Sequence, residues 1–128
     1  MLKLYKKQIA LTNPYYQGTT THILLDSNII VRKYTEKLPL KHSIRISIDC
    51  KCYFYFTSCI YKEILYLIKN KVLLKQFLKV NRIRLINCYH KFVYGDKCIK
   101  NTVFLNPFLR VATFDQNLLK NLKSKLNK

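Results

Sequence analysis

The sequence predicts a single α/β domain in which helices cover both faces of a central parallel sheet. Short apolar or aromatic segments alternate along the chain with segments that carry apolar residues at helical spacing. The predicted strands are separated by helices and are too far apart in sequence to form hairpins, which favours parallel pairing. The chain has 128 residues, of which 49% are hydrophobic, and this suits one domain with one buried core.

Four strands are predicted from their apolar or aromatic composition. The first, His22–Asp26, is a short apolar run typical of a buried parallel strand. The second, Cys52–Thr57, is rich in aromatic residues, which favour strands. The third and fourth predicted strands cover residues 83–86 and 110–114.

Helices are predicted between these strands from apolar stripes and capping residues. Thr57 or Ser58 can cap a helix that runs through Glu63 to Lys71. Pro39 falls in the first turn of another predicted helix, where proline is tolerated. In chain order, the predicted helices cover residues 27–34, 38–49, 58–71, the stripe at 73–78, 96–105 and 116–126.

The chain carries a strong positive charge. Twenty-four Lys and Arg residues against six Asp and Glu residues give a formal net charge of +18. Such a surface attracts polyanions, and nucleic acid is the polyanion that a small basic intracellular domain most often binds. Amino acids with A/T-rich codons are abundant throughout, so mutational bias accounts for part of this charge. Sequence specificity would require more than charge.

Membrane and secreted classes of protein do not fit this sequence. The longest charge-free apolar stretch, Tyr53–Tyr61, is far shorter than the roughly 20 residues of a membrane span. The first residues lack the uninterrupted apolar region of a signal peptide. Five cysteines form an odd set, which indicates reduced thiols or metal ligands in preference to disulfides. We expect a soluble intracellular domain with no membrane partner.

Four of the six acidic residues fall where a parallel sheet would bring them together. Asp26 and Asp115 each close a predicted strand, Asp96 opens a predicted helix, and Glu63 lies near the start of another. These positions share the carboxyl edge of the sheet, where ligands bind. Clustered carboxylates repel one another unless a cation lies among them, and their hard oxygens suit Mg²⁺ or Mn²⁺. The alternative is that each acid caps a helix or pairs with a surface cation.

Smaller polar residues flank the two acids at the strand ends. Asn28 follows Asp26 closely, and Thr113 precedes Asp115. Their side chains can hold the acids or a metal-bound water by hydrogen bonds, although Asn after a strand also caps helices. The other two acids of the chain, Glu36 and Asp49, are interpreted as surface residues.

A second candidate metal site consists of cysteine and histidine. Cys88, His90 and Cys98 place three ligands close together in sequence, across a loop between a predicted strand and a predicted helix. Cys59, at the start of another predicted helix, can be the fourth ligand, and Cys52 is its rival. Three cysteines and one histidine form the closed tetrahedral set of a structural zinc site. The alternative is that the cysteines pack as small apolar residues and the histidine lies in a loop.

These motifs together resemble one group of ribonucleases. The acid pattern comprises Leu24-Leu-Asp26-Ser-Asn28, Glu63, Asp96-Lys-Cys-Ile99 and Val111-Ala-Thr-Phe-Asp115-Gln-Asn-Leu118. The local signatures comprise Asn13–Gln17, Thr57–Cys59, Asn87–Lys91 and Tyr94–Cys98. The acid layout is similar to that of PIN-domain ribonucleases. With the Cys/His spacing, the chain from about Asn13 to Leu126 most resembles the pre-ribosomal RNA endonuclease of the eukaryotic small-subunit processome, the Fcf family.

The resemblance implies a fold and a set of functional residues. The fold would be a PIN-like three-layer α/β/α sandwich with a central parallel sheet. It would cover residues 22–128, after a short basic N-terminal extension over residues 1–21 and without the family's final strand and C-terminal tail. The implied catalytic acids are Asp26, Glu63, Asp96 and Asp115, and the implied zinc ligands are Cys59, Cys88, His90 and Cys98.

The implied activity is metal-dependent cleavage of pre-ribosomal RNA. Asp26 and Asp115 would be the central ligands of Mg²⁺ or Mn²⁺, Asp96 would complete the shell, and Glu63 would hold a metal-bound water. Pre-rRNA, guide RNA and processome proteins are the implied partners. The implied location is the nucleus and nucleolus, or the nucleolus of a reduced endosymbiont nucleus, a nucleomorph.

Two alternatives remain open from the sequence. One is a catalytically silent PIN-domain scaffold that binds pre-rRNA and processome proteins. Lys97, where a second acid is expected beside Asp96, favours it, whereas the presence of all four acids favours the enzyme. The other is a stand-alone nuclease of the toxin type, which shares the acids but has no reason to carry the Cys/His set.

Overall fold

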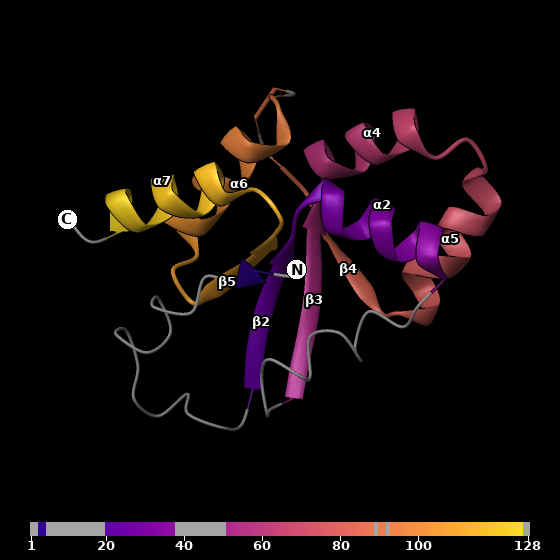
Figure 1. Cartoon of the computed structure of the whole chain (residues 1–128), viewed down its shortest axis with the longest axis horizontal. Helices are drawn as coiled ribbons and strands as arrows, with labels where there is room; N and C mark the ends of the chain where they lie inside the picture. Colours follow the sequence, from indigo (N-terminus) through magenta and orange to yellow (C-terminus); the bar gives the residue numbers. More distant parts are fainter. Residues whose placement is uncertain (1–2, 5–19, 38–50, 89, 92, 127–128) are drawn as a thin grey trace.

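The computed structural model describes residues 3–4, 20–37, 51–88, 90–91 and 93–126. Its centre is a sheet with four parallel strands, β2 (Thr20–Leu25), β3 (Lys51–Thr57), β4 (Ile83–Ile86) and β5 (Leu109–Thr113). A two-residue strand, β1 (Lys3–Leu4), pairs antiparallel with β5, and the strand order is β1-β5-β2-β3-β4 (Figure 1). The α/β fold with a central parallel sheet, predicted from the sequence, is confirmed.

Five helices in the described residues connect and follow the strands. They are α2 (Ser27–Glu36), α4 (Ser58–Leu67), α5 (Lys71–Val80), α6 (Gly95–Leu105) and α7 (Gln116–Leu126). The chain moves from β2 through β3 to β4 in one direction and then returns across the sheet to β5. Because parallel crossovers are right-handed, this reversal places α2, α4 and α5 on one face and α6 on the other, with α7 beside it (Figure 1).

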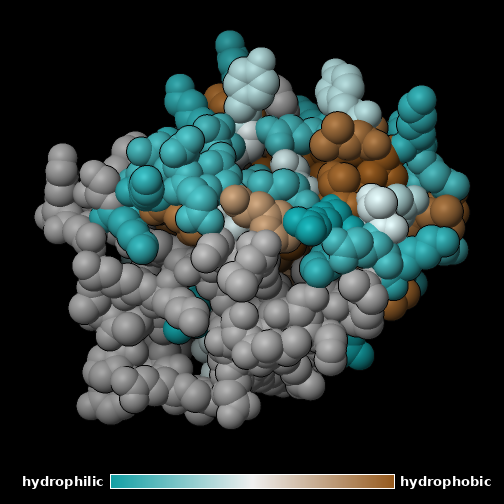
Figure 2. All heavy atoms as spheres, viewed as in Figure 1, coloured by the Kyte–Doolittle hydropathy of each residue, from teal (hydrophilic) through white to brown (hydrophobic). Residues whose placement is uncertain are grey.

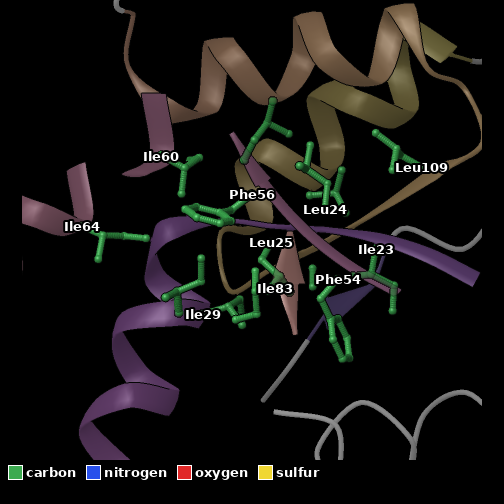
Figure 3. Packing of buried hydrophobic residues seen from close by; sticks show 14 of the residues in the cluster. Ile23, Leu24, Leu25, Ile29, Phe54, Phe56, Ile60, Ile64, Ile83 and Leu109 are labelled. Atoms are coloured by element: carbon green, nitrogen blue, oxygen red, sulfur yellow. The ribbon is translucent and has the colours of Figure 1, made fainter. Parts of the chain in front are cut away.

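The core lies between the sheet and its helices. Strand β2 contributes Ile23, Leu24 and Leu25, which have no exposed surface, as expected for a central parallel strand covered on both faces. Alternate residues of β3 point to opposite faces, and the buried Phe56 lies toward Ile60 and Ile64 of α4 (Figure 3). The continuous apolar segment at residues 23–25 therefore forms the centre of the molecule.

The element bounds differ from the predicted ones in two places. The helix predicted to continue to Lys71 ends at Leu67, because Asn70 begins a new helix by accepting a hydrogen bond from the backbone N–H of Leu73 at 3.1 Å. Strand β1 lies within the predicted N-terminal extension and was not predicted, because two residues carry no periodic pattern. The predicted helix at 38–49 lies outside the described residues.

The surface carries both hydrophilic and large apolar side chains. On the face shown in Figure 2, hydrophilic side chains surround a smaller group of apolar ones toward the right of the view. Exposed large apolar side chains on α4 and α5 include Tyr66, Leu67, Val72 and Val80. Across the described ranges, none of the helices combines the length and the apolar character required to traverse a membrane.

Candidate functional site

The carboxyl ends of β2 and β5 place two acids side by side at one edge of the sheet. Asp26 directly follows β2, and its backbone N–H donates a hydrogen bond to the carbonyl of Ala112 in β5 at 3.0 Å. The Asp26 side chain caps α2 by accepting from the backbone N–H of Ser27 at 2.7 Å. Asp115 is at the start of α7, where its Oδ1 accepts from the N–H groups of Asn117 and Leu118 at 2.9 and 3.2 Å. Both acids therefore lie at a helix N-terminus, which favours negative charge.

Thr113 links these two acids. Its hydroxyl donates to Oδ2 of Asp26 at 2.7 Å and accepts from the backbone N–H of Asp115 at 3.0 Å. The side-chain amide of Asn28 donates to the same hydroxyl at 3.3 Å, and its Oδ1 accepts from the backbone N–H of Phe114 at 3.4 Å. Thr113 is fully buried, so this network fixes the orientation of the Asp26 carboxylate.

Asp26 is the most buried of the four acids. Only 7% of its surface is exposed, and this burial raises the pKa of Asp26 above its ordinary value. Hydrogen bonds from Thr113 and Ser27 oppose that change, whereas the charges of Glu63 and Asp115 add to it. The carboxylates of Glu63 and Asp115 are therefore close enough to act on Asp26, and a cation bound among the three would relieve their repulsion.

The other two acids lie around the N-terminus of α6. The carboxylate of Glu63, from α4, accepts a hydrogen bond from the backbone N–H of Gly95. Tyr94, the residue before α6, contributes no side-chain cap, so Glu63 satisfies this N–H instead. Asp96 is exposed, and its Oδ1 accepts from the backbone N–H of Lys97 at 3.0 Å.

The acid edge, defined here as Asp26, Glu63, Asp96 and Asp115, has the donor chemistry of a Mg²⁺ or Mn²⁺ site. All four residues offer carboxylate oxygens, the ligands that these ions prefer. These oxygens do not converge on one ligand set, however. Among the described residues, the group of three or more side chains arranged to hold a metal ion is the cysteine and histidine cluster.

This thiol cluster consists of Cys59, Cys88, His90 and Cys98. The four ligand atoms lie within 4.8 Å of one another. The sulfur atoms of Cys88 and Cys98 are 3.4 Å apart, and the Cys98 sulfur is 3.6 Å from Nε2 of His90. A tetrahedral zinc ion with Zn–S bonds of about 2.3 Å requires sulfur atoms about 3.8 Å apart, so the cluster fits zinc with small adjustments. Cys52, the rival fourth ligand, is buried in β3 and is not part of the cluster.

Neighbouring groups orient the ligands of the thiol cluster. Nδ1 of His90 lies 2.6 Å from the carbonyl oxygen of Lys91, so a proton on Nδ1 leaves Nε2 as the ligand atom facing Cys98. The backbone N–H of Cys88 donates to the hydroxyl of Ser58 at 2.9 Å. These contacts are the outer hydrogen bonds that metal ligands ordinarily make.

The two neighbouring thiols of the cluster differ in acidity. Burial raises the pKa of Cys88, but hydrogen bonds from Ser58, Cys59 and Cys98 outweigh it and lower that pKa to about 6. Burial, followed by the nearby Cys88 sulfur, raises the pKa of Cys98 to about 12, although the Thr57 hydroxyl opposes this change. Cys88 therefore loses its proton more readily than Cys98, and a bound metal ion would favour the loss of both protons.

Several residues of this region differ from the sequence interpretation or were missed by it. The ring of His22 stacks on Tyr53 with ring centroids 5.4 Å apart, and its Nδ1 lies 2.9 Å from the hydroxyl of Tyr55. Glu36 is a surface residue, as predicted, and pairs with Arg32 at 2.8 Å. Gly95 was missed, although it is one of only two glycines in the chain and directly precedes a predicted helix. Asp49 lies outside the described residues.

Comparison with known proteins gives a consistent assignment. The Fcf1 family model matches residues 47–127. The "rRNA-processing protein FCF1 homolog" of Homo sapiens and that of Bos taurus are each 30% identical to the chain over 106 residues. Each match covers 83% of this chain and 54% of the relative, so the chain spans about half the length of these proteins.

A solved structure agrees in fold. The structure described as that of the "PIN domain endonuclease Utp24" superposes with a TM-score of 0.66 at 27% sequence identity. The match covers 80% of this chain and 77% of the solved one. Because the family model matches well over half of the chain and the fold agrees, the chain belongs to the Fcf1 family and has the fold of a PIN domain.

Proposed function

We propose that this protein is a metal-dependent endoribonuclease that cleaves pre-ribosomal RNA during maturation of the small ribosomal subunit. The observation that carries the proposal is the environment of Asp26, which is buried, oriented by Thr113 and acted on by the charges of Glu63 and Asp115. A buried carboxylate with two acidic neighbours is a common arrangement at functional sites and an unfavourable one in a purely structural role. The names of the relatives, an rRNA-processing protein and a PIN-domain endonuclease, support the same proposal.

Each of the four acids has a proposed role in hydrolysis of the RNA backbone. Asp26 and Asp115 would be the central ligands of a bound Mg²⁺ or Mn²⁺ ion, Asp96 would complete the ligand set, and Glu63 would orient the attacking water. The bound metal supplies Lewis-acid activation of water and offsets negative charge at the phosphate in the transition state. Hydrolysis of this kind leaves a 5′-phosphate and a 3′-hydroxyl and does not use the RNA 2′-hydroxyl as nucleophile.

Asn28 and Thr113 support this site without touching the reacting atoms. Thr113 holds Oδ2 of Asp26 and the backbone of Asp115 through one hydroxyl, and Asn28 holds that hydroxyl. This arrangement orients the Asp26 carboxylate and holds the backbone of Asp115 beside it. A carboxylate oriented in advance loses less freedom when it binds a cation.

The thiol cluster is proposed to be a structural zinc site. Cys59, Cys88, His90 and Cys98 supply four ligands, which leaves no open coordination position for substrate. Cys59 belongs to α4, Cys98 belongs to α6, and the other two ligands lie in the segment between β4 and α6. A zinc ion would therefore join two helices and the intervening loop.

The net charge of the chain and the names of its relatives support RNA as the partner. A net charge of +18 favours contact with phosphates, and such contacts carry little information about base sequence. We propose that guide RNA and processome proteins select the cleavage site in the nucleolus, or in the nucleolus of a nucleomorph.

The second candidate function is a scaffold that binds pre-rRNA without cleaving it. Lys97 beside Asp96, together with acids that do not converge on one ligand set, favours this alternative.

Cleavage of an end-labelled single-stranded RNA in Mg²⁺ or Mn²⁺ tests the proposal. Asp26→Asn keeps the side-chain shape but removes the charge that holds the cation, so cleavage should fall by orders of magnitude while RNA binding persists. Glu36→Gln, the same change at a surface acid, should cleave as the wild type does. Activity in EDTA or products with 2′,3′-cyclic phosphate ends would contradict the mechanism, and RNA binding without cleavage by the wild type would favour the scaffold.

A further inference from the structure

The thiol cluster and the acid edge are built on the same two helix N-termini. Helix α4 carries Cys59 and, one turn later, Glu63. Helix α6 carries Asp96 and, two residues later, Cys98. Each of these helices therefore contributes one residue to each site, and a shift of α6 relative to α4 would alter both sites together.

The buried Thr57 joins the two helix starts on the side of the thiol cluster. Its hydroxyl caps α4 by accepting from the backbone N–H of Ile60 at 3.2 Å. The Cys98 thiol lies 3.4 Å from the same oxygen, in donating geometry. A metal ion held by Cys59 and Cys98 would add a bond between the same two segments and restrict their relative movement.

Gly95 joins the two helix starts on the side of the acid edge. Its backbone N–H donates to the Glu63 carboxylate, and it is buried. A Cβ atom at Gly95 would lie 2.6 Å from Cδ1 of Ile60 and 2.8 and 2.9 Å from the two carboxylate oxygens of Glu63. Only a residue without a side chain permits this approach. The contacts are with the ends of flexible side chains, so an alanine would displace the Glu63 carboxylate and leave the helix intact.

We infer that Gly95 is a positioning residue for Glu63, and that zinc in the thiol cluster strengthens binding of a divalent cation at the acid edge by holding α6 against α4. This inference rests on the proposed function for the identity of the acid edge. Glu63 is one of the two carboxylates whose charge acts on Asp26, so its position sets part of the field that the cation experiences. Coupling of this kind is reciprocal, because each metal stabilises the helix arrangement that the other requires.

The test for Gly95 is the affinity of zinc-loaded protein for Mn²⁺, followed by electron paramagnetic resonance of the free ion. Gly95→Ala should weaken Mn²⁺ binding about tenfold, the usual effect of losing a group that orients a ligand. Glu63→Ala should weaken it to a similar extent, and Gly95→Ala should add nothing in the Glu63→Ala background. Circular dichroism and zinc content should stay at wild-type values in all three variants.

A second variant separates the two close contacts of Gly95. Ile60→Val removes Cδ1, so the pair Ile60→Val with Gly95→Ala keeps only the contacts with Glu63. This double variant should bind Mn²⁺ as weakly as Gly95→Ala alone. Recovery of wild-type affinity would show that Ile60, and not Glu63, had been displaced, and it would overturn the inference.

The test for coupling compares two cysteine variants that both leave the acid edge unchanged. Cys59→Ser removes a ligand of the thiol cluster, whereas Cys52→Ser changes a buried cysteine outside it. Mn²⁺ affinity should fall about fivefold or more in Cys59→Ser, the lower end of ordinary coupling between sites, and should be unchanged in Cys52→Ser. If Cys59→Ser, Cys52→Ser and Gly95→Ala all bind Mn²⁺ with wild-type affinity, the inference is overturned. The proposed metal site at the acid edge would still stand. A wild-type protein that binds no Mn²⁺ would overturn the proposed metal site as well.

Discussion

Replacing one cysteine of the thiol cluster should remove a metal ion and much of the stability of the chain. Cys59 and Cys52 are a matched pair, because both are buried, with 3% and 7% of their surface exposed, and only Cys59 belongs to the cluster. Serine at either position places a hydroxyl in a buried site, which costs about 1–3 kcal/mol of unfolding free energy. This cost is common to both variants. The difference between their unfolding free energies therefore measures the stabilisation by bound metal.

The expected difference in unfolding free energy follows from the binding of the metal to the folded state alone. A metal present at 100 times its dissociation constant stabilises the folded state by about 2.7 kcal/mol. For a chain of 128 residues, an unfolding entropy of about 2.1 cal/mol/K per residue converts 2.7 kcal/mol into about 10 °C of melting temperature. We therefore expect Cys59→Ser to melt at least about 10 °C below Cys52→Ser.

The assay is thermal unfolding in reducing buffer, together with elemental analysis of the same samples. The wild type and Cys52→Ser should contain about one zinc ion per chain and should lose melting temperature when a chelator is added. Cys59→Ser should contain little zinc and should not respond to the chelator. Wild-type protein without zinc, or equal melting temperatures for the two variants, would refute the reasoning from ligand geometry.

Three further predictions address the acid edge, the cap of α4 and the charge of the chain. Because burial raises the pKa of Asp26, this group favours the folded state below its unfolded pKa, and the contribution is lost as the pH rises through the folded pKa. Metal-free Asp26→Asn should therefore melt above the wild type at pH 7 but not at pH 3, and Glu36→Gln should show no such change. Thr57→Val leaves the buried N–H of Ile60 unsatisfied and should cost about 1–2 kcal/mol in chemical denaturation, whereas Thr57→Ser keeps the cap. Affinity for single-stranded RNA, measured by fluorescence anisotropy, should fall with salt with a logarithmic slope of about −0.7 per phosphate contact, and a flat response would contradict a phosphate interface.

The fold was predictable where local signals agree with tertiary packing. Strand β2 was predicted from residues 23–25 because a central strand must be apolar on both faces. The start of α4 was predicted because Thr57 is a capping residue and its hydroxyl forms the expected bond. The break between α4 and α5 was predicted a few residues too late, at Lys71 instead of Leu67. The side chain of Asn70 caps the start of α5 there, a local signal that apolar spacing does not carry.

The sequence indicated which residues form the candidate sites, but it did not indicate the contacts among them. The spacing of Cys88, His90 and Cys98 indicated a metal site, but only the fold separates Cys59 from Cys52 as the fourth ligand. Gly95 illustrates the limit of sequence reasoning, because its role depends on a carboxylate 32 positions earlier in the chain. Contacts between distant segments leave no periodic pattern, so they emerge only from the packed structure.

The positions of the four acids explain how one arrangement serves both folding and chemistry. Asp26, Glu63, Asp96 and Asp115 each accept a hydrogen bond from a backbone N–H at the first turn of a helix. In a chain with few acids, placing four of them at helix N-termini offsets the partial positive charge of those termini. It also places the four acids at the carboxyl edge of the sheet, where ligands bind in folds of this class. Substituting any one of them therefore removes a backbone contact at a helix start as well as a carboxylate of the proposed metal site, so loss of cleavage alone would not identify a ligand. The metal affinity of the Asn or Gln variant, in which a side-chain oxygen can still cap the helix, separates the two roles.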